Sequence, residues 1–507
     1  MPALIEKRDR HVVPRWRPSI HRLNHAEFFP AKPIHAQWEP NLSELARLQR
    51  EWEQHRTLPF ASDLLGVALV LDQPQVAKPA ALSILRSGLE VPVGLRRLAR
   101  RVLGEDSEAK QLTVSRLVSS SETLRTNIHL TRERLRKGPL NPLLWADLAL
   151  MYSSIGKNER TAKYLQIARQ LAPDDRFILR VTARFHVHQG QPDVAVDLLR
   201  RSPLFKVDPW IISAEIAVSE LAGRRPLNVR HARAMLEGNS FTPDHISELA
   251  SAVGSLELRS GSLRKARQLF RQSLLMPTEN SIAQATWMAN EEKGLEIPEQ
   301  LFGVPSAFEA QALHHYYRAD WVPALDAALE WQNDEPFSIL PAIMGSHLAA
   351  AMEDYGLSEQ MARQGLMANP HEFIMLNNLA FSLASNNQPD EAARLFRTVD
   401  PRHLSQRYKI FYFATLGLIR YRQGDCDGGR IFYQQAIAQA SSDHAEQERA
   451  TALLFLAKEE LRTHSADGPR LLREAEEALK NLKTEVVGAT RLVVDRLLSN
   501  RTEKTSE

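Results

Sequence analysis

Residues 142–175 read PLLWADLALMYSSIGKNERTAKYLQIARQLAPDD, and this stretch decides the fold. Its first half carries apolar residues at spacings of three, four and seven, on one helical face: Trp145, Leu148, Ala149 and Tyr152. Gly156 then allows a tight turn, and Pro173 stops a second helix that carries the small residue Ala168. The stretch therefore predicts two short helices packed as a hairpin.

The same signals return along the chain as far as about residue 440. Turn glycines follow one another at intervals of 34, 33 and 38 residues, at Gly156, Gly190, Gly223 and Gly261. On later second helices, a small residue precedes a leucine or phenylalanine by four positions, at Ala195, Ala266 and Ala392. Weaker copies lie around residues 210–236, 308–331 and 342–365. A period near 34 residues indicates an array of seven or eight hairpins.

The order of these residues resembles the tetratricopeptide repeat, whose pattern is Trp-x2-Leu-Gly-x2-Tyr, then Ala-x3-Phe, then Pro. The sequence departs from this pattern at two positions that tolerate side chains of different volume. Thr161 stands where alanine is usual, and Leu165 where an aromatic is usual. The resemblance implies an all-α fold, an α-solenoid of helical hairpins forming a right-handed superhelix with a concave inner surface. One hairpin buries too little apolar surface to offset its chain entropy, whereas a stack forms a continuous core.

Pattern and composition divide the chain into seven segments. They are an extended arm rich in proline, aromatics and arginine (1–40), a helical block without the repeat (41–138), a first repeat block (139–294), a linker loop (295–305), a second repeat block (306–440), a C-terminal helical cap (441–500) and a disordered tail (501–507). The block at 41–138 is expected to cap the other end of the solenoid. The loop at 295–305 is either a hinge or partner-contact loop, or a tolerated insertion.

Composition places the chain among ordinary globular proteins, with 43% hydrophobic and 25% charged residues over 507 positions. Cys426 is the single cysteine, which excludes an intrachain disulfide and a cysteine-rich zinc site and favours a reducing compartment. The most apolar stretch, residues 64–71, is far shorter than the about 20 residues that span a membrane. We therefore predict a cytoplasmic protein without a membrane segment.

The N-terminal part of the sequence is basic. Residues 1–140 hold 23 Lys and Arg against 15 Asp and Glu, a net +8, and the remainder holds 41 against 46, a net −5. Arg15, Trp16 and Arg17 lie among prolines that prevent a regular helix. Such an arm either stacks on bases and pairs with phosphates, or anchors itself across the helical surface. The charge bias also suits solubility, or docking onto the acidic remainder of the chain.

A basic face is expected on the first helix of the second repeat, where Arg180, Arg184 and His188 recur every four residues. In tetratricopeptide domains the first helices line the concave groove, so the resemblance places these three residues there. It gives Arg259 the position of His188 two repeats later, and it adds Asn377 and Asn378 from another first helix. Such a stripe could hold an acidic peptide or a nucleic-acid backbone, or it is a solvated face paired with carboxylates.

No motif points to a catalytic, cofactor-binding or metal site. The pair at 156–157 lacks the other residues of a phosphate-binding loop, and the glycine-rich stretch at 424–429 lacks the ligands of a calcium loop. Both coincide with expected turns between helices. Cys426 has no evident histidine partner and reads as a small core residue. We therefore predict a protein that is not an enzyme and needs no cofactor.

Taken together, these features predict a non-catalytic scaffold or adaptor that binds a protein partner through the concave surface of the solenoid. The chain also looks broadly similar to bacterial tetratricopeptide proteins found beside defence or nuclease modules. The alternative is nucleic-acid binding through the basic N-terminal region and the arginine-lined groove. Steep dependence of affinity on salt would distinguish the second reading from the first.

Overall fold

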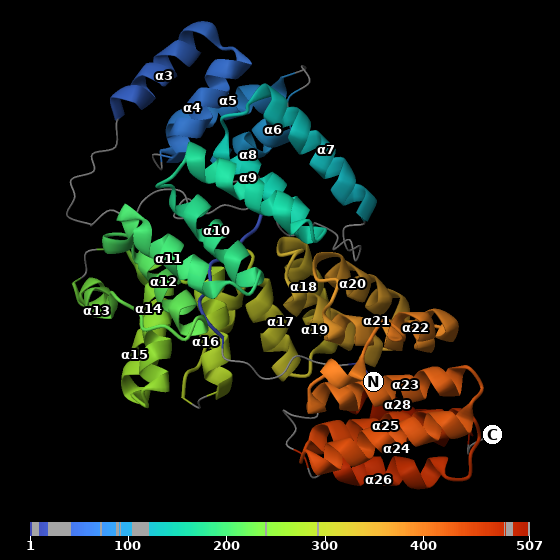
Figure 1. The fold of residues 1–507 in the computed structure, drawn as a ribbon. Coiled ribbons are helices and arrows are strands. Elements are labelled where there is room, and N and C mark those ends of the chain that lie inside the picture. Colours follow the sequence, from blue (N-terminus) through green and yellow to red (C-terminus); the bar gives the residue numbers. More distant parts are fainter. Residues whose placement is uncertain are drawn as a thin grey trace. The chain divides into compact units, whose positions relative to one another are not determined.

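The computed structural model describes residues 1–2, 10–18, 42–70, 73–87, 91, 93–103, 121–238, 241–291, 294–480, 482 and 490–504. All regular elements in this part of the chain are helices, so the predicted all-α class is confirmed (Figure 1). In the same residues, no helix combines the length and the apolar character that crossing a membrane requires. The chain divides into a larger unit, residues 1–31 and 116–507, and a smaller unit, residues 32–115.

The described residues of the smaller unit form four helices. They are α3 (Leu42–His55), α4 (Leu58–Val70), α5 (Pro74–Arg86) and α6 (Val93–Leu103), each packed against the next. Trp52, Leu64 and Ile84 are buried in a common core. Pro74 starts α5, where the missing N–H of proline costs no helical hydrogen bond.

The larger unit begins its helices with α7 (Ser121–Lys137), followed by pairs. The first four pairs are α8 (Pro142–Ser154) with α9 (Asn158–Leu171), α10 (Arg176–His188) with α11 (Pro192–Arg201), α12 (Pro209–Leu221) with α13 (Val229–Glu237), and α14 (Pro243–Arg259) with α15 (Leu263–Ser273). Helix α7 packs against α8, and this part of the larger unit starts at residue 116.

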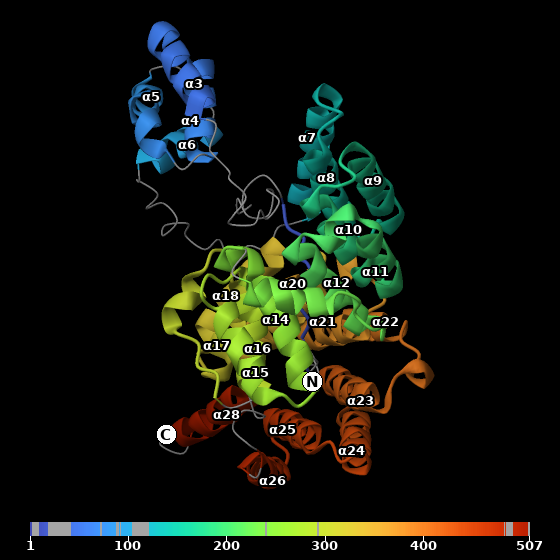
Figure 2. The same ribbon diagram turned by 90° about the vertical axis from the view of Figure 1, so that its left-hand side faces the viewer.

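Helix α16 (Glu279–Glu291) has no second helix of its own; the short 3-10 turn η3 (Glu299–Gly303) follows it. Pairing then resumes with α17 (Phe308–Tyr317) and α18 (Trp321–Asp334), α19 (Ile339–Ala351) and α20 (Tyr355–Ala368), α21 (Phe373–Ser385) and α22 (Pro389–Phe396), α23 (Gln406–Arg422) and α24 (Cys426–Ser442), and α25 (Glu446–Arg462) and α26 (Gly468–Lys480). Helix α28 (Thr490–Lys504) comes last. Figures 1 and 2 show these pairs stacked in chain order.

The turns inside the pairs explain which repeats are easy to read in the sequence. Gly156, Gly190, Gly223 and Gly261 all have positive φ angles, between 64° and 81°, which glycine adopts without steric cost. In later pairs the same conformation is taken by Ala319, Glu353 and Asn387, with φ between 58° and 63°. The glycine period is therefore lost there although the hairpin geometry persists.

The array turns back on itself. Helix α8, in the first pair, contacts α20, several pairs later along the chain. Gly156 fits at this contact because a Cβ atom built on it would lie 2.8 Å from the Met367 carbonyl oxygen. Continuous helix pairing with a curved path confirms the predicted solenoid, and a right-handed superhelix is consistent with it.

Candidate binding surface and the N-terminal arm

Residues 10–18, here called the arm segment, lie against the first helices of the array. Their sequence, Arg-His-Val-Val-Pro-Arg-Trp-Arg-Pro, forms no helix or strand, because prolines restrict its backbone to extended conformations. Val12 and Trp16 are each 1% exposed, as buried as the core of the helical pairs. Figure 1 shows the segment as a dark blue trace beside α10 and α16. Its partners, here called the arm-contact surface, are Phe185, Glu220, Glu279, Asn280, Gln284, Glu309, Glu335 and Phe337.

Arg10 donates hydrogen bonds to side chains on two helices, α16 and α17. Its Nε and Nη2 donate to the two carboxylate oxygens of Glu309 on α17, at 2.9 and 2.8 Å. Its Nη1 and Nη2 also donate to Gln284 and Asn280 on α16, at 2.7 and 2.9 Å. The same two amides donate in return to main-chain carbonyl oxygens of the arm segment, Gln284 to Arg10 at 2.7 Å and Asn280 to Val13 at 2.9 Å. These reciprocal bonds fix the position of the extended backbone.

The other two arginines meet further carboxylates. Arg15 donates to Glu335 at 2.8 Å and also to Glu309, which it therefore shares with Arg10. The guanidinium of Arg17 lies 3.2 Å from a carboxylate oxygen of Glu279. Charge-assisted bonds of this kind are stronger than neutral ones, and burial shields them from solvent.

The acidity of the carboxylates reflects this pairing. Burial alone would raise the pKa of Glu309, but Arg10 and Arg15 lower it to about 2. Burial also acts to raise the pKa of Glu335, and Arg15 with Arg184 brings it below its usual value. Both groups are therefore ionised at neutral pH, and neither holds a proton to donate in acid–base chemistry.

Trp16 sits in an aromatic pocket. Its ring centroid lies 5.1 Å from that of Phe337, in the segment after α18, and 6.1 Å edge-on from that of Phe185 on α10. Phe337 is fully buried. Aromatic contacts at these separations add to the free energy of burial. The tryptophan thus joins α10 to the segment between α18 and α19.

Two residues of the expected basic face form the wall of this pocket. The Arg184 guanidinium lies 4.9 Å from the centroid of the Phe337 ring, and the His188 ring meets it edge-on at 5.1 Å. Burial lowers the pKa of Arg184, and burial with the nearby Arg184 lowers the pKa of His188 to about 4. His188 is therefore neutral at physiological pH.

Arg180, the third member of that face, contacts residues of other helices and not the arm segment. Its Nη2 donates to Glu248 at 2.7 Å, and its guanidinium lies 4.4 Å from the centroid of the Trp210 ring. Only 6% of the residue is exposed. Arg180 is thus paired with a carboxylate, but it is buried instead of lying on a solvated helix face.

Arg259 reaches the arm segment through a histidine. It donates to Glu220 on α12, and its Nη2 lies 3.2 Å from His11 Nδ1. His11 Nδ1 is in turn 3.3 Å from the other carboxylate oxygen of Glu220. These three side chains form a small cluster at the start of the arm segment.

The two asparagines lie further along the array, beside Met1. Asn377 donates to the Met1 carbonyl oxygen at 2.9 Å, and Thr415 donates to the Asn377 amide oxygen, also at 2.9 Å. Asn378 instead donates to Ser346 at 3.0 Å within the helical stack. Of the predicted residues, Arg15, Trp16, Arg17, Arg259 and Asn377 therefore touch the N-terminal region directly or are part of it.

Sequence reasoning missed the carboxylates that receive the arm segment. Glu279 lies on the unpaired α16, while Glu309 lies on α17 and Glu335 directly after its partner helix α18, in the region where the repeat pattern is weakest. Arg10 was also missed, because it stands apart from the Arg-Trp-Arg triplet.

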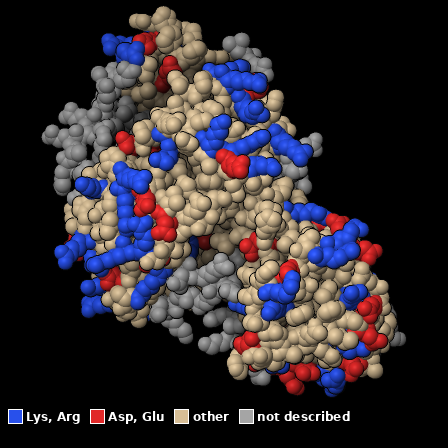
Figure 3. Space-filling model, viewed as in Figure 1, with Lys and Arg blue, Asp and Glu red and all other residues tan. Residues whose placement is uncertain are grey.

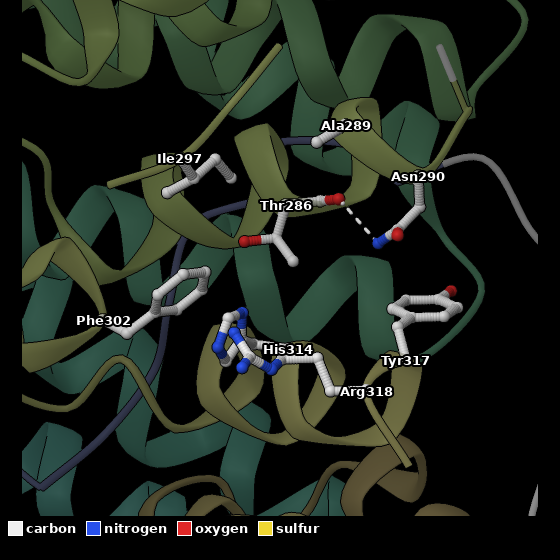
Figure 4. Close-up of a pocket in the computed structure, with 8 residues that line it drawn as sticks. All are labelled: Thr286, Ala289, Asn290, Ile297, Phe302, His314, Tyr317 and Arg318. Carbon is white, nitrogen blue, oxygen red and sulfur yellow. Dashed lines mark hydrogen bonds between the residues drawn. The ribbon is translucent and has the colours of Figure 1, made fainter. Parts of the chain in front are cut away.

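A small pocket lies between α16, η3 and α17, with a volume of about 210 Å³ (Figure 4). His314 stacks on Phe302 with ring centroids 4.0 Å apart, and Asn290 donates to the Thr286 carbonyl oxygen at 2.9 Å. Burial lowers the pKa of His314. Within the described residues no cluster of histidine, cysteine or carboxylate side chains could hold a metal ion. The pocket brings together no set of groups for a reaction.

Basic side chains gather on the second helices, over α13 and α15 (Figure 3). The exposed members of this outer basic face are Arg201, Lys206, Arg225, Arg230, Arg264, Lys265 and Arg271, none ion-paired to another described residue. The elements are adjacent, since His231 Nε2 lies 2.9 Å from the Lys206 carbonyl oxygen and Gln272 donates to that of Leu236 at 3.0 Å. The sequences of α13 and α15 contain one carboxylate, Glu237.

Neither a known protein family nor a curated protein matches the sequence. Solved structures match over most of its length, among them the Cut9–Hcn1 hetero-tetramer of the APC/C, at 12% identity and a TM-score of 0.33 over 89% of this chain and 92% of that chain. Yeast Tom70 matches at 13% identity and a TM-score of 0.29 over 91% and 96%, and a human IFIT1 dimer with PPP-AAAA at 11% and 0.29 over 87% and 96%. By its own helix pairing, the described part of the chain is an all-α solenoid of paired helices.

Proposed function

We propose that this protein is a non-catalytic scaffold that binds a segment of a partner protein on the arm-contact surface. The observation that carries the proposal is the arm segment itself, an extended peptide held by side chains from several hairpins. A surface that binds nine residues of its own chain has the side chains needed to bind a similar segment of another protein. The single cysteine favours a reducing compartment, so we place the scaffold in the cytoplasm.

Binding of this kind suits a solenoid. Each hairpin offers one or two contacts, and stacking adds them over a long preformed surface. Because the helices hold the side chains in place, little conformational entropy is lost when a partner binds. The ionised, ion-paired state of Glu309 and Glu335 also supports a binding role over acid–base catalysis.

Nucleic-acid binding is the second candidate, and the outer basic face favours it. The expected groove arginines are matched by carboxylates of the array, so a phosphate backbone would compete with those carboxylates for them. The outer face instead offers seven exposed cations. If all seven met phosphates, the logarithm of the affinity would fall with the logarithm of salt concentration with a slope of about −6.

A photo-reactive amino acid placed by itself at each of two positions tests the proposal. His188 borders the arm-contact surface, and Arg264 lies on the outer basic face. After irradiation in the native host, we expect one partner protein joined through His188 and not through Arg264, with the joined peptides identified by mass spectrometry. Adducts only from Arg264, or only to nucleic acid, would contradict the scaffold role assigned to this surface.

A further inference from the structure

We propose that the arm segment is a resident ligand, and that the external partner displaces it with a segment of the form Arg-x4-Arg-Trp-Arg. This inference rests on the proposed function and specifies the chemistry of the partner. Three sets of contacts support it: those to the charged side chains, those to the aromatic anchor and those to the extended backbone.

Charge is the first requirement. Three carboxylates, Glu279, Glu309 and Glu335, face the three arginines of the arm segment. Glu309 is bound by two guanidinium groups at once. An empty surface would leave these buried carboxylates with most of their countercharge removed, which is strongly unfavourable. The surface therefore selects a cationic occupant, and an acidic or neutral segment is excluded.

The aromatic anchor is the second requirement. Trp16 fills the pocket between Phe185 and Phe337. The guanidinium of Arg184 lies over the ring of Phe337. A smaller side chain would leave a cavity between two buried rings, Phe185 and Phe337. The tryptophan is flanked on both sides by arginine, so the pocket and two of the charge sites act as one recognition element.

Backbone contacts set the register. The amides of Asn280 and Gln284 donate to the carbonyl oxygens of Val13 and Arg10, and these bonds do not depend on the side chains at those positions. A foreign segment can make the same bonds provided that it is extended. Specificity then comes from the spacing, with one arginine five residues before the Arg-Trp-Arg triplet.

The arm segment can leave without dismantling the array. Consecutive helices from α7 to α26 contact one another directly, and the arm segment contributes no helix or strand to that stack. A covalently attached arm, however, acts at an effective concentration on the order of millimolar. A free peptide should therefore compete poorly with the intact chain and well once the connection is cut.

The test uses the full chain with a site-specific protease sequence inserted after Ala31, the last residue of the first part of the larger unit. The cut chain is titrated with the peptide RHVVPRWRP, and release of the fragment 1–31 is followed by size exclusion and mass spectrometry. Two control peptides replace all three arginines by glutamine, or the tryptophan by alanine. We expect release by the first peptide, at least tenfold weaker competition by each control, and unchanged helical circular dichroism.

Loss of helical signal when the fragment leaves, or no release at any peptide concentration, would show a permanent structural arm and overturn the inference. Equal competition by the glutamine peptide would remove the charge requirement. A second measurement uses the substitution Glu279→Gln in the cut chain. Because Arg17 then loses this carboxylate partner, the fragment 1–31 should dissociate faster. Failure of the two proposals is distinguishable. If His188 captures a partner but the peptide releases nothing, the scaffold stands and the resident ligand falls. Release without any captured partner would overturn the scaffold role and with it the displacing partner, and would leave only an arm segment that a peptide can displace.

Discussion

Glu309 is the residue that ties the arm segment most firmly to the array. It accepts from Arg10 and from Arg15, whose positions in the sequence are separated from it by 299 and 294 residues. Such a long-range pairing has no local signature, so the sequence could supply Arg15, Trp16 and Arg17 as candidates but not their acceptors. The same holds for Phe337, which lies in a segment between two helices and carries no repeat signal.

Glu309→Gln should destabilise the larger unit strongly. The substitution keeps the shape of the side chain and leaves two buried guanidinium groups short of countercharge, which typically costs about 3–5 kcal/mol. Urea unfolding followed by circular dichroism measures the change. Glu237→Gln on exposed α13 is the matched control, with an expected effect within about 0.5 kcal/mol. Equal midpoints for the two variants would show that the shared carboxylate is unimportant.

Acid should weaken the protein in two stages. The pKa values of His188 and of His347 are lowered to about 4, in each case chiefly by burial, so both are neutral when folded and take up protons once unfolded. Their stabilising contribution is complete above the unfolded pKa of about 6.5 and declines as pH falls toward 4. That of Glu309 is complete above about 4.5 and is lost as pH falls toward 2.

His188→Gln isolates the first stage. Each unit of lowered pKa corresponds to about 1.4 kcal/mol, so one buried histidine accounts for about 3 kcal/mol between pH 6.5 and 4. The variant should lose part of the decline in urea midpoint over that range, because His347 and His314, whose pKa values are also lowered, remain. An unchanged pH profile would mean that the pKa of His188 is the same in the folded and the unfolded chain.

Among the elements, the turn between α8 and α9 has two roles: it joins the two helices, and it contacts α20. Gly156 has a φ of 66°, and it also lies against the main chain at the end of α20. Gly190 has nearly the same φ, 67°, with nothing within 4 Å of its Cβ position. Sequence period alone could identify both as turn residues, but could not show that one of them also lies at the contact between distant pairs.

Gly156→Ala should therefore cost more than Gly190→Ala. Both substitutions place an alanine in a left-handed conformation, at a cost of about 1–2 kcal/mol. In Gly156→Ala the new methyl group also meets the Met367 carbonyl oxygen, a main-chain atom that cannot rotate away. Thermal unfolding of the two variants measures the difference. Identical melting temperatures would argue against the contact between α8 and α20.

For the molecule as a whole, the period near 34 residues was enough to predict the solenoid, because each hairpin must bury its face on the next. Between residues 142 and 442, the described helices form eight pairs and the unpaired α16, in line with the expected number. The return of α8 onto α20 was beyond prediction, since it depends on small rotations summed over many pairs. The arm was left open between packing within the chain and binding outside it, and the structure places the arm segment on its own array.

Limited proteolysis by trypsin tests this placement most directly. Trypsin cleaves after arginine, so the bonds following Arg10 and Arg15 report whether the arm segment is held. We predict that both bonds survive in the native chain and are cut rapidly in Glu309→Gln, with the fragments identified by mass spectrometry. Immediate cleavage after Arg10 and Arg15 in the unaltered protein would contradict the occupied surface on which the proposed function depends.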